Sequence, residues 1–184
     1  MLKQLFTLGC LMMCLATIAQ NDVSPINHDF QADLQYWDYG VWVEKGDKPV
    51  VKFRAEAIGY NDNRSVRIRT LSGNYKGDFF DAYLTAALRP LKKGKDYKLE
   101  FWVRSDDNKE HSIAFKVYSG TNFKTEFFIQ NVYFKGDSKW HRITKTFEAS
   151  DSTKLFDYNH PILKFGVAGE HGIFYIDDIS VNRI

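Results

Sequence analysis

Hydrophobic and polar residues alternate in short stretches along the chain from about residue 50 onward. In the clearest stretch, 97–104, Tyr97, Leu99, Phe101 and Val103 lie on one side and mostly polar residues lie on the other. A period of two residues places successive side chains on opposite sides of a strand. Such stretches, separated by Gly, Asn, Asp and Pro, predict strands at 50–57, 65–71, 80–88, 97–104, 112–118, 126–134, 140–147, 162–167 and 173–181. No stretch after residue 20 has a convincing helical period.

Two neighbouring predicted strands, 97–104 and 112–118, place their odd-numbered residues on the apolar side. The polar turn between them predicts a hairpin, in which Trp102 and Tyr118 share the opposite, polar side. About ten short strands without helices predict an all-β domain, a jelly-roll β-sandwich of two antiparallel sheets. The stretch 21–35 has weak strand character, and we expect it to wrap around the edge of the sandwich.

The N-terminus has the features of a secretory signal peptide, which we place at 1–19. A short basic start precedes the uncharged stretch 5–18, which is too short to cross a membrane as a helix. Cleavage would leave 20–184 as a single secreted, periplasmic or cell-surface domain with no transmembrane segment. It would also remove the two cysteines, Cys10 and Cys14. The alternative is a lipoprotein attached through Cys10, because the residues before Cys10 resemble the end of a lipobox.

Charge and motifs point away from nucleic acid and from catalysis. The net charge is +2 and both signs are mixed along the chain, so nucleic acid is not an expected partner. The densest basic spot, 92–95, is interpreted as a solvated turn between strands. Common nucleotide-binding, nucleophile and zinc motifs are missing, and the five histidines are scattered. Among the acidic residues, Glu170 is the best candidate for a catalytic carboxylate, but its flanking glycines are interpreted as a turn before the last strand. We therefore predict that the protein is not an enzyme.

Several stretches together resemble the motifs of carbohydrate-binding modules. Residues 91–104 resemble the run L-x-x-G-x-x-Y-x-L-x-F-W-V-R, 140–147 resemble a W-x-x-(aliphatic)-x-x-x-F strand, and 174–181 resemble the closing strand. The stretch 27–31, followed by Trp37, resembles the opening N-x-x-F-E … W. Their order and spacing are similar to the family 4/9/22-like group across nearly the whole chain after residue 20. The resemblance implies a galactose-binding-like jelly roll.

The resemblance also implies a structural calcium ion. In the family, an aspartate of the closing strand, carbonyl oxygens and an acidic residue near the N-terminus hold the ion. Asp177 and Asp178 are the carboxylates that interrupt the apolar closing strand here, and Gln31 occupies the N-terminal acidic position. Gln31 still offers an oxygen to calcium, although a neutral one, and Asp62 could add charge. The alternative is an aspartate that accepts backbone hydrogen bonds without any ion.

Sugar binding requires aromatic rings for the C–H groups and polar side chains for the hydroxyls. A loop aromatic of the family stacks on sugar near the position of Tyr75. The candidate ligand-binding residues are Tyr75, Phe79, Trp102, Arg104, Tyr118 and Gln130. Two alternatives stay open: Trp102 could be covered by the N-terminal segment, and Tyr75 could be an ordinary exposed loop residue.

The expected function is therefore that of a secreted, non-catalytic module that binds a polysaccharide or oligosaccharide, alongside a separate glycoside hydrolase. The alternative is a structural or adhesive sandwich of a cell-surface assembly that binds no sugar. Burial of the candidate aromatic residues would favour this alternative.

Overall fold

The computed structural model of the protein describes residues 21–43, 46–62, 64–71, 75–121, 126–150 and 155–184. The predicted signal peptide and both cysteines lie outside the described residues. No described helix is long and apolar enough to cross a membrane.

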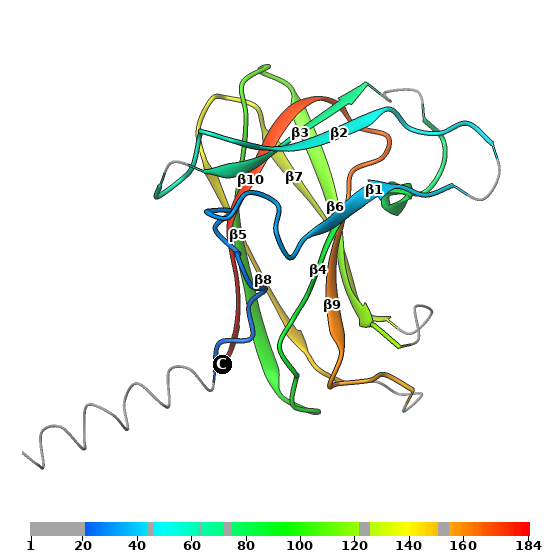
Figure 1. The fold of residues 1–184 in the computed structure, drawn as a ribbon, viewed down its shortest axis with the longest axis vertical. Helices are drawn as coiled ribbons and strands as arrows, with labels where there is room; N and C mark the ends of the chain where they lie inside the picture. Colours follow the sequence, from blue (N-terminus) through cyan, green and yellow to red (C-terminus); the bar gives the residue numbers. More distant parts are fainter. Residues whose placement is uncertain (1–20, 44–45, 63, 72–74, 122–125, 151–154) are drawn as a thin grey trace, which may run out of the picture.

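In the described part of the chain, ten strands form two antiparallel five-stranded sheets packed face to face (Figure 1), which confirms the predicted all-β sandwich. Sheet A has the order β2 (Val51–Glu56), β3 (Ser65–Leu71), β10 (His171–Arg183), β5 (Asp96–Ser105) and β8 (His141–Glu148). Sheet B has the order β1 (Asp38–Val41), β4 (Ala82–Ala87), β9 (Pro161–Gly166), β6 (Glu110–Ser119) and β7 (Glu126–Lys135). A 3₁₀ turn, η1 (Phe79–Asp81), precedes β4.

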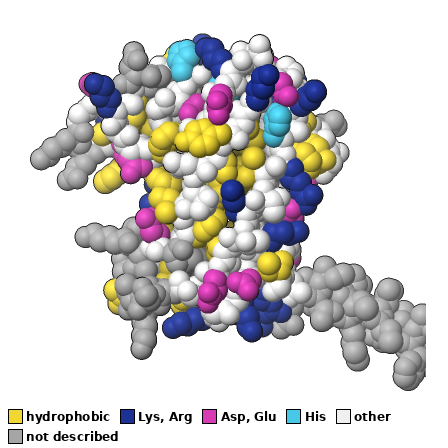
Figure 2. Space-filling view, turned by 180° about the vertical axis from the view of Figure 1, so that it is seen from behind, with side chains coloured by type: hydrophobic (Ala, Val, Ile, Leu, Met, Phe, Trp, Pro, Cys, Tyr) yellow, Lys and Arg dark blue, Asp and Glu magenta, His cyan; other side chains and the backbone are white. Residues whose placement is uncertain are grey.

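The core lies between the sheets and is rich in aromatic side chains. Phe101 of sheet A meets Phe115 and Phe165 of sheet B edge-on, with ring centroids 5.3 and 5.1 Å apart. Such edge-to-face pairs are favourable beyond the area that they bury. At the open edge opposite β1 and β2, Phe128 of β7 stacks on Phe147 of β8 at 4.8 Å. Seen from behind, hydrophobic side chains run along the middle of the molecule with charged side chains around them (Figure 2).

The N-terminal segment, which we expected at the edge of the sandwich, lies along the end of β10, the central strand of sheet A. Asp22 forms a β-bridge with Asn182, and the Val23 amide donates to the Val181 carbonyl at 2.8 Å. Phe30 is fully buried and packs against Trp37, whose indole N–H donates to the Asn27 carbonyl at 3.0 Å. The opening motif is therefore part of the hydrophobic core.

The predicted hairpin of 97–104 with 112–118 is wrong. β5 pairs with β10 and β8 in sheet A, whereas β6 pairs with β7 and β9 in sheet B. The odd-numbered residues of both strands are buried, as predicted, because the inner faces of the two sheets point toward each other. Parity alone does not distinguish a hairpin from a crossing between sheets. Trp102 and Tyr118 consequently lie on opposite outer faces of the sandwich.

Candidate functional site

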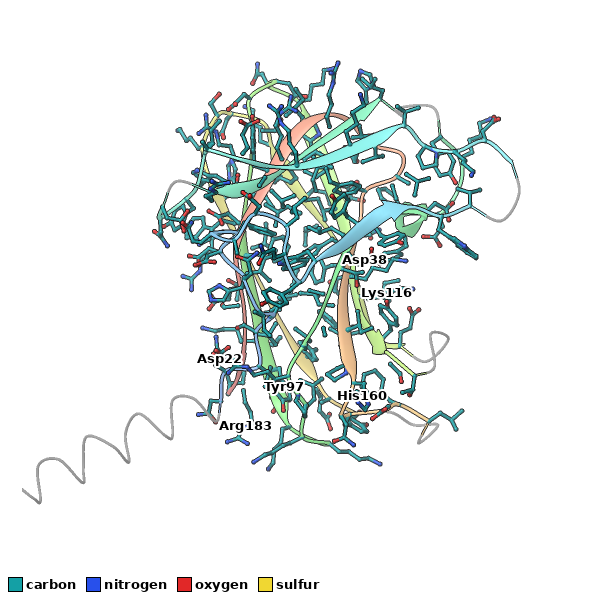
Figure 3. The ribbon with its side chains drawn as sticks, in the orientation of Figure 1. Asp22, Asp38, Tyr97, Lys116, His160 and Arg183 are labelled. Atoms are coloured by element: carbon teal, nitrogen blue, oxygen red, sulfur yellow. The ribbon has the colours of Figure 1, made fainter. Side chains whose placement is uncertain are left out.

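The candidate site is the outer face of sheet B, which we call the B face. The register aligns its side chains in rows that cross all five strands. One row consists of the polar residues Asp38, Thr85, Lys164 and Lys116 and ends in the apolar, exposed Ile129. The next row consists of Gly40, Tyr83, Gly166, Ala114 and Asn131. Figure 3 labels Asp38 of β1 and Lys116 of β6, which belong to the first row and are separated in it by β4 and β9.

The 3₁₀ turn covers the middle of the B face. Asp78 caps η1 by accepting a hydrogen bond from the Phe80 amide at 2.7 Å, and the Phe79 carbonyl accepts from the Ala168 amide at 2.9 Å. A side chain at Gly166 would lie only 2.7 Å from the Phe80 ring. The glycine therefore permits Phe80 to lie directly on the sheet.

Two lysines flank this ring and face each other across β6 and β9. The Lys116 ammonium lies 4.6 Å from the Phe80 centroid, and the Lys164 ammonium lies 4.4 Å from the Tyr83 centroid. Both distances are within the range of cation–π attraction. These contacts hold the flexible lysine side chains against rings, so their N–H groups are positioned before a ligand arrives.

The charges on the B face are mixed. Burial, followed by the positive charge of Lys116, lowers the pKa of Lys164. Lys116 also forms an ion pair with Glu126 at 2.8 Å. Burial, together with the carboxylate of Asp38, raises the pKa of Tyr83, so its hydroxyl stays protonated at neutral pH. The face thus combines donors and acceptors without a strong excess of either charge.

Exposed aromatic residues border the B face at both edge strands, Trp42 next to β1 and Tyr133 on β7. The Trp42 amide donates to the Asp81 carbonyl at 2.8 Å and so continues the ladder between β1 and β4. Trp42 is 66% exposed. At the other side of the sheet, Tyr133 of β7 pairs with Ser112 and is 67% exposed. Both rings are accessible to a ligand.

Three of the predicted ligand residues belong to this region. Tyr118 lies on β6 on the B face, but it is only 7% exposed. Phe79 begins η1 and is half-buried. Tyr75 lies in the segment before η1, where its hydroxyl donates to Asp81. That hydrogen bond is the main cause that raises the pKa of Tyr75 to about 12, and it fixes the ring rather than leaving it a free loop residue.

The other three predicted residues lie elsewhere. Trp102 is on the outer face of sheet A, where it stacks on Tyr60 at 3.6 Å with an interplanar angle of 17°. Arg104 lies on the same face and forms an ion pair with Asp106 at 2.9 Å. Gln130 is exposed on the edge strand β7, on the side opposite the B face. A loop other than the N-terminal segment therefore covers Trp102.

Sequence patterns alone missed most of the B face. Lys116, Lys164, Tyr83 and Asp38 come from four strands that are adjacent only in the folded sheet. Each occupies the outward position of its strand, which a correct register would have revealed. Phe80 was missed because η1 looks like the start of a strand in the sequence.

The predicted calcium residues lie at a β-bulge in β10. The register with β5 shifts between Asp177 and Ser180, and Asp178 has a positive φ of 50°. Asp177 is 1% exposed, and its two oxygens accept from the amides of Tyr60 at 2.7 Å and Asp178 at 2.8 Å. Burial, and then the charges of Asp62 and Asp178, raise its pKa to about 7.

The surroundings of Asp177 favour a bound cation through their charge but offer it few ligands. The carboxylates of Asp62, Asp178 and the desolvated Asp177 would all be stabilised by a hard cation that prefers oxygen ligands. The described residues include no cluster of three or more His, Cys, Asp or Glu side chains placed to hold a metal. Gln31 is exposed, and its hydrogen bonds run to Asp29. An ion here would therefore take ligands mainly from Asp177, Asp178 and backbone or amide oxygens.

Glu170 lies before β10, as the glycine pattern suggested, but it also has a buried partner. It accepts from Ser112 at 2.7 Å and lies 3.2 Å from Nδ1 of His111. Nε2 of His111 lies 2.8 Å from Asp107. His111 is 2% exposed, so its contacts with Glu170 and Asp107 join the strand ends from inside the fold.

Comparison with known proteins assigns the family. The carbohydrate-binding domain family CBM_4_9 matches residues 26–157, so the chain belongs to this family. No curated protein matches the chain.

Solved structures share the fold. The structure described as "CBM4 structure and function" has a TM-score of 0.67 and 18% identity, covering 88% of this chain and 100% of its own. The CBM22-1–CBM22-2 tandem of Xyn10C from Paenibacillus barcinonensis has a TM-score of 0.59 and 15% identity, covering 89% of this chain and 50% of its own. The CBM22-1–GH10 modules of Xyn10B from Clostridium thermocellum, complexed with xylohexaose, have a TM-score of 0.56 and 15% identity. The match covers 89% of this chain and 28% of that one.

Proposed function

We propose that the domain is a secreted, non-catalytic module that binds a polysaccharide or oligosaccharide on the B face. The observation that carries the proposal is the pair of cross-strand rows, in which the half-buried Tyr83 lies beside Lys164, with Lys116 and Asp38 in the neighbouring row. Phe80 is buried and supports Lys116 from below rather than offering a ring of its own. Sugars present apolar C–H faces and polar hydroxyls at once, so they suit rings flanked by donors and acceptors.

The exposed rings extend this surface beyond its centre. Trp42 and Tyr133 lie at the borders of the B face, where a chain of several sugar units would reach them. Because Tyr118 is buried and Trp102 is stacked on Tyr60, we base the proposal on the more accessible rings of Tyr83, Trp42 and Tyr133. The glycan-binding function therefore rests on residues that differ largely from the predicted set.

Calorimetry of the domain against soluble neutral glycans tests this function. We expect dissociation constants between about 1 mM and 1 µM, equivalent to roughly −4 to −8 kcal/mol. Tyr83→Ala and Lys164→Ala should each weaken binding about tenfold while the melting curve stays cooperative. Lys139→Ala, at an exposed turn, is the control and should bind normally. Absence of binding across a broad glycan panel would favour the structural or adhesive role instead.

Calcium at the β10 bulge is a second part of the proposal. A cation held by Asp177 and Asp178 would offset the cost of burying the Asp177 carboxylate next to two others. Calcium at a hundredfold excess over its dissociation constant should stabilise the fold by about 2.7 kcal/mol, and Asp177→Asn should abolish that gain. Identical melting curves with calcium and with a chelator would refute the site.

Export and partnership complete the proposal. We infer cleavage after residue 19, so the secreted form should begin at Gln20 by mass spectrometry, whereas a lipid on Cys10 would place it on a membrane.

We also propose that the domain acts beside a separate glycoside hydrolase. Adding the domain should then raise hydrolysis of an insoluble polysaccharide that it binds, and the domain alone should release no sugar.

A further inference from the structure

The outer face of sheet A, which we call the A face, carries an unusual set of positive charges. Outward side chains of β2 and β3 face each other as two successive basic pairs, Lys52 with Arg69 and Arg54 with Arg67. Like charges directly opposite each other in an antiparallel pair destabilise the sheet. Two such pairs side by side are therefore a cost that folding itself does not explain.

The basic row continues across the sheet. Arg67 pairs with Tyr175 of β10, and Tyr175 pairs with Arg104 of β5. The row from Arg54 to Arg104 thus crosses four adjacent strands, a span of roughly 14 Å at about 4.8 Å per strand. Three guanidinium groups are aligned at right angles to the strands.

Carboxylates on the same face balance only part of this charge. Glu56 forms ion pairs with Arg54 and, at 3.8 Å, with Arg67, and Asp106 pairs with Arg104. Within the described part of the chain, Lys52 and Arg69 take part in no ion pair. Both are exposed, so their charges are available to a partner.

We propose that the A face binds an acidic polysaccharide, one that carries carboxylate or sulfate groups. Guanidinium groups form paired hydrogen bonds with such anions, and four of the five basic residues here are arginines. Single-stranded nucleic acid fits less well, because its bases stack on exposed rings, whereas Tyr175 is 7% exposed and Trp102 is stacked on Tyr60. The proposal concerns the face opposite the B face and does not rest on the proposed function.

The test measures binding of polygalacturonate (carboxylate) and dextran sulfate (sulfate), with uncharged dextran as control. The wild-type domain should bind at least one of the two polyanions but not dextran, and its affinity should fall about tenfold or more between 50 and 200 mM NaCl. Comparing the two polyanions identifies which anionic group is preferred. Tyr83→Ala on the B face should leave this binding unchanged, so failures of the two proposals are distinguishable.

Two charge-reversal variants with the same change in net charge distinguish binding at the A face from general electrostatic attraction between the protein and a polyanion. Lys52→Glu with Arg69→Glu should weaken polyanion binding at least tenfold, whereas Lys92→Glu with Lys93→Glu changes the net charge equally and should change affinity less than about twofold. Circular dichroism melts check that both variants fold. Equal loss in both variants, no binding by the wild type at 50 mM NaCl, or tighter binding to single-stranded DNA or to anionic phosphatidylserine vesicles would overturn the proposal.

Discussion

At the scale of single residues, Gly166 determines how closely η1 approaches sheet B. A side chain there would lie 2.9 Å from the Phe79 backbone as well as 2.7 Å from the Phe80 ring. We therefore predict that Gly166→Ala destabilises the domain by about 1–3 kcal/mol, because backbone cannot move aside as a flexible side chain can. Urea denaturation measures the loss, and weaker glycan binding should accompany it.

Gly40 provides the matched control, because it lies in the same cross-strand row. A side chain at Gly40 would contact only the end of Tyr83, its hydroxyl oxygen at 3.8 Å and the ring carbon that bears it at 4.0 Å, both ordinary distances. Gly40→Ala should consequently leave the free energy of unfolding within about 0.5 kcal/mol of the wild type. A similar loss in both variants would show that η1 is not held in close contact with the sheet.

A second single-residue prediction concerns His111 and pH. Burial by itself lowers the pKa of His111, but its bonds to Glu170 and Asp107 outweigh burial and raise that pKa above its usual value. A raised folded-state pKa gives stability that is present below the unfolded value of about 6.5 and is lost as the pH rises through the folded pKa. We expect the free energy of unfolding to decline as the pH rises from about 6.5 through the folded pKa of His111.

The acidic limb follows from the partner carboxylates. Burial raises the pKa of Glu170, but hydrogen bonds from His111 and Ser112 lower it more, so its stabilising contribution is lost as the pH falls through its folded value. Chemical denaturation across pH should show both limbs, and His111→Gln should flatten the alkaline one. His160→Gln, at a largely exposed histidine, is the control and should keep it. A pH profile unchanged by His111→Gln would contradict this assignment.

At the scale of elements, alternation predicted the strands well and their partners poorly. The predicted 65–71 coincides with β3, and the other predicted strands overlap β2 and β4 to β10. β1 was missed because it has four residues, one of them Gly40. Pairing was missed because burial parity is the same for a hairpin and for two strands in facing sheets. The register that creates both outer faces is therefore the part that local pattern does not encode.

The segment before β3 packs against β5, and this packing indicates that Trp102 stabilises the fold. Tyr60 stacks on Trp102 and also meets Trp140 edge-on at 6.2 Å. We predict that Trp102→Ala lowers stability by about 2 kcal/mol, since a half-buried ring and its stacking partner are lost, while B-face glycan affinity stays unchanged. Arg142→Ala, at the paired exposed position, should cost less than about 0.5 kcal/mol. Loss of glycan binding without loss of stability would instead make Trp102 a binding platform.

At the scale of the whole molecule, the sequence predicted the kind of binding site but not the residues that form it. Aromatic abundance and the family motifs indicated a glycan-binding sandwich, and the family match supports that class. The predicted residues nevertheless divide between two outer faces and an edge, because the paired-strand assumption placed Trp102 beside Tyr118. Lys116 and Lys164 were not candidates, since each looks like a solvated charge until the fold sets them across from one another.

The two outer faces differ in charge, and this predicts independent binding. The B face mixes Lys116 and Lys164 with Asp38 and Glu126, whereas β2 and β3 of the A face set four outward basic side chains, Lys52, Arg54, Arg67 and Arg69, against the carboxylate of Glu56. Because the ligands would lie on opposite sides of a rigid core, their binding energies should add. Saturation with a neutral glycan should leave polyanion affinity unchanged within about twofold, and raising salt from 50 to 200 mM should weaken only polyanion binding. Calorimetric titration of each ligand into the complex with the other measures this, and mutual exclusion would place both ligands on one face.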